Sequence, residues 1–202
     1  MKQLTELEED ALNELFNISL GGAAKLLSEM ISNEILLTVP SLKIISLEEA
    51  LKLETLTSNE VCSIEQKFKG SLGNGSAFIL FHKDSSLEIV RMMMKDYVQI
   101  NEVSHFEKDA LSEIGNIILN SILSNLAKMS DKKIETDIPE FFIGKYEDIL
   151  REDYARISKA DTILMAFIDY HLKGKDIKGY IFFLLESETI KQLSRVLLEK
   201  LK

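Results

Sequence analysis

Residues 7–40 read LEEDALNELFNISLGGAAKLLSEMISNEILLTVP, and residues 106–139 read FEKDALSEIGNIILNSILSNLAKMSDKKIETDIP. The two stretches align without a gap at an offset of 99 residues, and they are identical at twelve of 34 positions. Chance would give roughly two or three identities over this length, so the match indicates an internal repeat. We interpret the chain as a duplication whose seam lies near residues 98–104.

The duplication predicts the same order of elements in each half. A long amphipathic helix comes first, because apolar residues recur at helical spacing. A strand follows and should end at a proline, which cannot donate to a strand ladder. A short helix, a two-stranded hairpin and a closing helix complete the half. The expected ranges are 5–31, 35–39, 46–53, 61–69, 76–82 and 85–97, then 104–129, 134–138, 146–152, 162–172, 177–185 and 187–201.

These elements predict an α+β fold with a β-sheet packed against helices. We expect one pseudo-two-fold domain over residues 1–202, built of repeats at about 5–98 and 104–202 that share one core. In the first hairpin, Asn74-Gly75 is the sequence typical of a tight turn.

Composition excludes several classes of protein. Apolar residues make up 46% of the 202 residues, which is enough for a sizeable core. The single cysteine, Cys62, cannot form an internal disulfide and fits a reducing compartment. The formal charge of −9 with scattered Lys and Arg disfavours nucleic acid as a partner. With no signal-peptide pattern and no apolar run of about 18 residues, we expect a soluble, cytoplasmic protein without membrane insertion.

The common catalytic and cofactor motifs are missing. The three histidines lie far apart in sequence, which argues against a metal site, so we expect no metal and no bound cofactor. The glycines between residues 70 and 75 match neither the dinucleotide fingerprint nor the P-loop. Cys62 has no histidine near it in sequence and is expected to fill the core rather than act as a nucleophile.

One polar pair stands inside each repeated helix. Glu14 and Asn17 are three residues apart, as are Glu113 and Asn116, so each carboxylate projects beside a carboxamide on one helical face. One interpretation is a solvated face that both halves inherited. The other is a pair of duplicate active sites, because a carboxamide donates and accepts hydrogen bonds and can hold a water in line with an electrophilic phosphorus. Phosphoryl transfer needs mostly positioning and charge stabilisation.

At these residues the sequence resembles the CheC family of bacterial chemotaxis phosphatases. The family's motif is Asp or Ser, three residues, Glu, two residues, Asn, and about 22 residues to a Pro. It occurs here twice and in full, which resembles the two-site type, as Asp10, Glu14, Asn17 and Pro40 and as Asp109, Glu113, Asn116 and Pro139.

The resemblance implies hydrolysis of the aspartyl-phosphate of a CheY-like response regulator, in chemotaxis or a related two-component pathway. Asn17 and Asn116 would then orient the attacking water, and Glu14 and Glu113 would bind a lysine of the receiver domain. The receiver would hold Mg²⁺, so this chain would need none, and a CheD-type deamidase would be a further partner. The resemblance gives Asp10 and Asp109 a supporting role and Pro40 and Pro139 a structural one.

Two alternatives remain open at this point. The chain could instead be a non-catalytic binding module for a receiver domain, a CheD-type deamidase or the flagellar switch. The two sites also differ, because Leu15-Phe16 stands where the second repeat has Ile114-Gly115. Phe16 either crowds the docking of a receiver or turns into the core, so the site at residues 113–116 is the safer assignment.

Overall fold

The two repeated stretches form the two longest helices, α1 (Glu6–Ile31) and α5 (Val103–Ser130). Thr5 caps α1 in a capping box with Glu8, which satisfies free amide groups of the first turn. Each helix is followed by a residue at positive φ, Ser32 and Asp131, which turns the chain back toward the sheet. The computed structural model describes residues 5–53, 60–70, 73–93, 103–156, 162–172 and 175–200.

The remaining elements follow the predicted order, except that the strand at residues 140–145 was not predicted. They are β1 (Ile35–Ile45), α2 (Leu47–Ala50), β2 (Glu60–Gly70), β3 (Gly73–His82), α4 (Lys83–Met93), β4 (Ile134–Thr136), β5 (Glu140–Lys145), α6 (Tyr146–Arg156), β6 (Thr162–Leu172), β7 (Lys175–Leu185) and α7 (Ser187–Lys200). The predicted seam at 98–104 falls mostly outside the described residues. The repeat boundaries therefore stay a prediction.

The described strands form one antiparallel sheet in the order β1-β6-β7-β3-β2-β4, with β5 also paired to β2. The order reads the same from both edges when β4 and β5 are taken as the counterpart of β1. Each half thus adds its first strand to the hairpin of the other half, β1 to β6 and β4 with β5 to β2. This exchange makes one continuous sheet, and the predicted α+β fold with a sheet packed against helices is confirmed.

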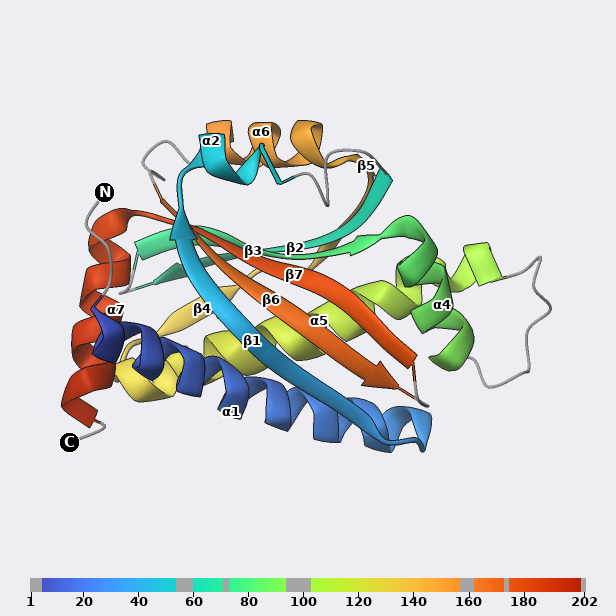
Figure 1. The fold of residues 1–202 in the computed structure, drawn as a ribbon, viewed down its shortest axis with the longest axis horizontal. Coiled ribbons are helices and arrows are strands. Elements are labelled where there is room, and N and C mark those ends of the chain that lie inside the picture. The colour runs from blue at the N-terminus through green and yellow to red at the C-terminus, as the bar shows by residue number, and fades with distance from the viewer. Residues whose placement is uncertain are drawn as a thin grey trace.

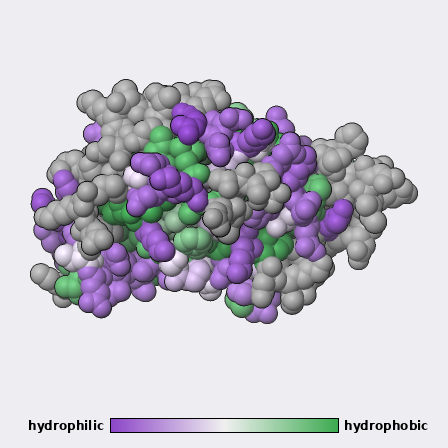
Figure 2. Space-filling model, turned by 45° about the horizontal axis from the view of Figure 1, so that its top comes forward, coloured by the Kyte–Doolittle hydropathy of each residue, from purple (hydrophilic) through white to green (hydrophobic). Residues whose placement is uncertain are grey.

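Helices cover both faces of the sheet (Figure 1). The larger core lies between the sheet and the helices α1 and α5, where Phe16 meets Phe183 edge to face at 5.6 Å between ring centroids. A smaller core lies on the other face beneath α2 and α6, with Tyr146 against Phe182. Figure 2 shows the side of α2 and α6, where hydrophobic residues gather in patches between hydrophilic ones.

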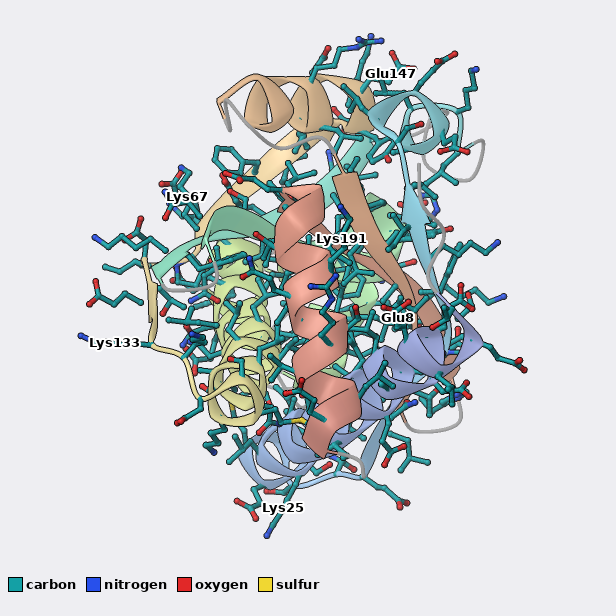
Figure 3. The ribbon with its side chains drawn as sticks, turned by 90° about the vertical axis from the view of Figure 1, so that its left-hand side faces the viewer. Glu8, Lys25, Lys67, Lys133, Glu147 and Lys191 are labelled. Atoms are coloured by element: carbon teal, nitrogen blue, oxygen red, sulfur yellow. The ribbon has the colours of Figure 1, made fainter. Side chains whose placement is uncertain are left out.

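Helix α7 packs across α1 and α5 at one end of the molecule (Figure 3). There the Ser194 hydroxyl of α7 donates to the Glu8 carboxylate of α1 at 2.9 Å. At the equivalent place in the second repeat, the Ser86 hydroxyl of α4 lies 2.6 Å from the Glu107 carboxylate of α5. The first helix of each half is therefore bonded to the last helix of the other half, as the strands are.

The expectation that the first strand ends at Pro40 is wrong. Strand β1 continues through Pro40 to Ile45, and its pairing with β6 shifts register between Thr38 and Ser41. A proline is tolerated at such an irregularity because no ladder bond needs its missing N–H. In the second repeat β4 ends at Thr136, and Pro139 lies in the break before β5.

The expected turn at Asn74-Gly75 is also wrong. Asn74 pairs with Lys69 inside the β2–β3 ladder, and Gly70 pairs with Gly73, so the connection falls at residues 71–72, outside the described part of the chain. Gly75 is required for a different reason. A Cβ atom there would lie 2.6 Å from the Leu184 carbonyl oxygen of β7, so only glycine allows the two strands to approach.

Candidate functional site

The second-repeat cleft is an open hollow of about 410 Å³ between α5 and the segment that joins β4 to β5. On the helix side it presents side chains spaced along one face, in agreement with their three- and four-residue separation. The lining residues are Gln66, Asp109, Ser112, Glu113, Asn116, Asn120, Thr136, Asp137, Ile138 and Pro139. Four residues of the second predicted motif are thus brought together, although Pro139 is 23 residues from Asn116.

Exposure differs among the side chains of the second-repeat cleft. Glu113 and Asp109 are exposed, whereas Asn116 is half-buried. Ile138 is 87% exposed, which is unusual for a large apolar residue. The cleft therefore combines an accessible carboxylate, a partly enclosed carboxamide and an uncovered apolar side chain at its edge.

A chain of amide hydrogen bonds holds Asn116. Its Oδ1 accepts from Asn120 Nδ2 at 2.6 Å, and Asn120 Oδ1 accepts from Gln66 Nε2 at 3.1 Å. Gln66 Nε2 also lies 3.2 Å from the Asp137 carbonyl oxygen. Asn120 and Gln66 were missed in the sequence. The separation of four residues between Asn116 and Asn120 was a usable signal, whereas Gln66 lies on a distant strand.

The first-repeat site is arranged differently. Asn17 and Glu14 are exposed on α1, but Asn17 Oδ1 accepts a hydrogen bond of 3.2 Å from the backbone N–H of Val39. Val39 itself is 7% exposed and belongs to the larger core. The strand that precedes the proline therefore lies directly against the carboxamide, where in the second repeat the equivalent Ile138 stands out toward solvent.

Phe16 does not crowd the first site. Its side chain is fully buried against Phe183, so the expectation that it turns into the core is confirmed. The equivalent Gly115 serves close packing, since a Cβ atom there would lie 2.5 Å from Cγ2 of Ile64 on β2. The position before each asparagine thus faces the sheet, and it sets how closely each helix approaches it.

Asp10 and Asp109 are both exposed within the helices. Neither caps its helix, since Thr5 caps α1 and Asp109 is several residues into α5. Asp109 lines the second-repeat cleft, which places it nearer to a bound partner than a helix-supporting role requires. The roles given to the six motif residues of the two helices stay predictions.

The single cysteine lies outside the cleft. Cys62 is fully buried, and its Sγ lies 3.1 Å from Ser86 Oγ and 3.3 Å from Glu107 Oε1. Burial, with a further contribution from Glu107, raises the pKa of the Cys62 thiol to about 12. A thiol that stays protonated at neutral pH is a poor nucleophile, which agrees with the core-filling role expected from the sequence.

Two further searches bear on the site. Within the residues that the structure describes, no three His, Cys, Asp or Glu side chains converge in a way that could hold a metal ion. None of the described helices combines the length and the apolar character needed to cross a membrane.

The chain is similar in sequence to known proteins. Residues 62–158 match the family model described as chemotaxis phosphatase CheX. The chain is 23% identical over 197 residues to the CheY-P phosphatase CheC of Bacillus subtilis (strain 168), a match that covers 94% of this chain and 93% of the relative.

Solved structures share the fold at low sequence identity. The crystal structure of Thermotoga maritima FliY superposes with a TM-score of 0.77 at 20% identity, covering 98% of both chains. FliM in the FliG–FliM complex from H. pylori gives a TM-score of 0.65 at 13% identity, covering 95% of this chain and 100% of that one. The CheX–CheY–BeF3–Mg²⁺ complex from Borrelia burgdorferi gives 0.51 at 18% identity, covering 86% and 97%. At such identities these likenesses establish the fold alone.

The continuous sheet, the two long helices and the paired motifs define a protein of the chemotaxis-phosphatase class of fold. The chain belongs to the CheC/CheX/FliY superfamily.

Proposed function

We propose that this protein hydrolyses the aspartyl-phosphate of a CheY-like response regulator, and that the second-repeat cleft is its principal site. The main observation behind the proposal is that Glu113 and Asn116 line the same open cleft. The named activity of the Bacillus subtilis relative, a CheY-P phosphatase, supports it, as does the complex of a Borrelia burgdorferi CheX with CheY, BeF3 and Mg²⁺.

In the proposed reaction a water oxygen attacks the phosphorus, and the bond from phosphorus to the aspartyl oxygen of the receiver breaks. The products are inorganic phosphate and the free carboxylate of the receiver. Asn116 would hold the attacking water through its carboxamide, because this group both donates and accepts hydrogen bonds. Such positioning is the main contribution that a protein makes to phosphoryl transfer. Mg²⁺ would be held by the receiver.

Glu113 is suited to hold the partner rather than the water. It is exposed at the wall of the second-repeat cleft, where its carboxylate can pair with a receiver lysine near the phosphate. Ile138, uncovered at the same cleft, offers an apolar contact to the docking surface. The first-repeat pair Glu14 and Asn17 would act as a second site, in which a backbone N–H of β1 holds Asn17 Oδ1 in place of an asparagine side chain.

A second candidate function is a binding module without catalysis. The fold likeness to FliM in a complex with FliG favours it, since the same architecture there is part of a protein assembly. Such a module would bind a receiver, a CheD-type deamidase or a component of the flagellar switch. It would leave the lifetime of the phosphorylated receiver unchanged.

The experiment that separates the two functions measures phosphate release from a Mg²⁺-loaded, phosphorylated CheY-like receiver from the same genome. The native protein is added at substoichiometric amounts, beside the double variant Asn17→Ala/Asn116→Ala and the control Asn74→Ala on β3. We expect turnover with the native protein and the control, and none with the double variant. Binding without acceleration would favour the binding module. A double variant as active as the native protein would refute the assigned site.

A further inference from the structure

Gln66, Asn120 and Asn116 are linked by side-chain amide hydrogen bonds, and the Asp137 carbonyl oxygen determines which atom donates in each bond. The Asp137 carbonyl oxygen can only accept, so the group of Gln66 that faces it must be the Nε2 donor. The same Nε2 donates to Asn120 Oδ1. Because Gln66 is 1% exposed on a central part of β2, its side chain is held by the packing around it.

The orientation of the Asn120 amide in turn determines that of the Asn116 amide. Asn120 Oδ1 accepts a hydrogen bond from Gln66 Nε2 and lies 3.4 Å from the Thr136 hydroxyl. The Nδ2 group of Asn120 is therefore the end that faces Asn116. Asn116 Oδ1 therefore accepts at 2.6 Å, and the amide orientation in which Nδ2 would face Asn120 is excluded. The Nδ2 group and one lone pair of Oδ1 of Asn116 are left to act in the cleft.

We propose that Asn120 and Gln66 are positioning residues that set the orientation of the Asn116 carboxamide for hydrolysis, an inference that rests on the proposed function. Neither residue needs to touch the phosphate. Their contribution is to hold one of the two amide orientations before the receiver arrives. A water held by the wrong end of the carboxamide is misdirected, and misplacement of about 1 Å at a reacting group costs up to about 10²-fold in rate.

The first repeat lacks both residues. Gly21 stands where the second repeat has Asn120, and a Cβ atom added at Gly21 would meet nothing within 4 Å. By strand register, Gln66 on β2 corresponds to the buried Ile168 on β6. Asn17 is instead held by the Val39 N–H. The two sites thus hold the equivalent carboxamide by different means.

The variant Asn120→Asp tests the inference with almost no change in shape. An ionised Asp accepts but cannot donate, so Asn116 must turn its Nδ2 toward residue 120 and present the reversed orientation to the cleft. We expect kcat for receiver dephosphorylation to fall by about 10-fold to 10²-fold, with KM and thermal stability close to native. When the new carboxyl is protonated it can donate again. At an ordinary Asp pKa of about 3.9, the ratio of variant to native activity should therefore rise between pH 8 and pH 5, by about 2-fold for a 10-fold loss and by about 8-fold for a 10²-fold loss.

Two controls separate positioning from charge and from helix damage. Asn74→Asp adds the same charge on β3, outside the second-repeat cleft, and Ser124→Ala alters an exposed side chain one turn beyond Asn120 on α5. Both should keep native kcat at every pH. Each rate is corrected for the receiver's own dephosphorylation at that pH, so that only the stimulated part is compared.

A measurement without any receiver tests the hydrogen bonds themselves. In ¹⁵N-labelled native protein, the side-chain NH₂ protons of Asn120 should exchange with water more slowly than those of Asn74. In Asn120→Asp the NH₂ resonances of Asn116 should shift, as its amide turns.

The outcomes distinguish this inference from the proposed function. Suppose that the native protein is active. If Asn120→Asp then has native kcat, or if the ratio of its activity to native activity does not change with pH, the positioning role alone is overturned. The positioning role is also overturned if the side-chain NH₂ protons of Asn120 exchange with water as fast as those of Asn74. A native protein that binds the phosphorylated receiver without accelerating its hydrolysis overturns the proposed function, and the positioning role with it.

Discussion

The two repeats carry the same motif in two different settings. In the first repeat the strand that precedes the proline is part of the core, and the N–H of Val39 lies on Asn17. In the second repeat the strand is interrupted after Thr136, and Ile138 is exposed beside a cleft. An identical spacing of residues therefore gives an exposed carboxamide held by a strand backbone in one half, and a half-buried carboxamide held by a side chain at the wall of a cleft in the other.

The difference shows that a motif specifies which side chains share a helical face, while the neighbouring strand decides what can reach them. The bulge in β1 keeps the ladder continuous past Pro40. In the equivalent segment of the second repeat the strand is interrupted between β4 and β5, although the Asp137 N–H still donates to the Lys67 carbonyl oxygen of β2 at 2.9 Å. We expect the two sites to differ in activity for this reason, and the following variants test parts of that comparison.

The largest effect on stability should come from Phe16→Ala, which tests the buried position before the first asparagine. Phe16 is fully buried against Phe183, so the variant should lose about 3–5 kcal/mol of unfolding free energy. Urea denaturation followed by circular dichroism measures it. A loss below about 1 kcal/mol would mean that this side chain is not part of the core, and would reopen its role at the docking surface.

The next comparison sets Val39→Ser against Ile138→Ser, which change equivalent positions. Val39→Ser should cost about 1.5–3 kcal/mol of stability because it removes a buried side chain. Ile138→Ser should leave stability within about 0.5 kcal/mol, since its side chain is exposed, and should raise KM for the phosphorylated receiver. Denaturation curves and steady-state kinetics give both quantities. Equal losses of stability would contradict the open form of the second-repeat cleft.

A pair of glycines should respond with opposite signs. Gly115→Ala places a Cβ atom 2.5 Å from Ile64, and overpacking of about 1–3 kcal/mol should exceed the gain in helix propensity. Gly21→Ala meets no atom within 4 Å and should stabilise the protein by about 0.5–1 kcal/mol. Thermal unfolding of both variants provides the test. Stabilisation by Gly115→Ala would mean that α5 is not held close to β2.

The smallest effect concerns the buried thiol of Cys62, which contacts Ser86 and Glu107. The pKa of the Cys62 thiol is raised to about 12, so iodoacetamide at pH 8 should modify it only in the unfolded protein. The thiol keeps its proton in the folded state to higher pH than in the unfolded state. Its contribution to stability is therefore complete below about pH 9 and decreases as the pH rises toward 12. Rapid alkylation of the native protein would contradict this burial.

Much of the fold could be predicted from the sequence because local patterns determine it. Helical spacing of apolar residues located α1 and α5 to within a few residues, and the repeat gave the order of the described elements other than β5. The course of β1 past Pro40 and the place of the hairpin turn could not be predicted. Both depend on register against strands distant in sequence, and the close approach of Gly75 to β7 outweighed the turn preference of Asn74-Gly75.

The candidate site could be predicted only in part. The helical spacing of Glu113 and Asn116 placed them on one face, and the structure brings both to one cleft. The contribution of Gln66 could not be foreseen, since it reaches Asn120 from β2, more than fifty residues away. The hydrogen bond from a backbone N–H to Asn17 could not be predicted from residue types either, because any residue except proline at position 39 supplies that donor.

The most direct test of the central claim compares Asn116→Ala with Asn17→Ala in phosphate release from a phosphorylated CheY-like receiver, at substoichiometric protein and in the presence of Mg²⁺. The account predicts that Asn116→Ala loses most of the stimulated rate, up to about 10²-fold, while Asn17→Ala keeps most of it. Equal losses in the two variants, or a larger loss in Asn17→Ala, would contradict the claim that the open cleft of the second repeat is the principal site.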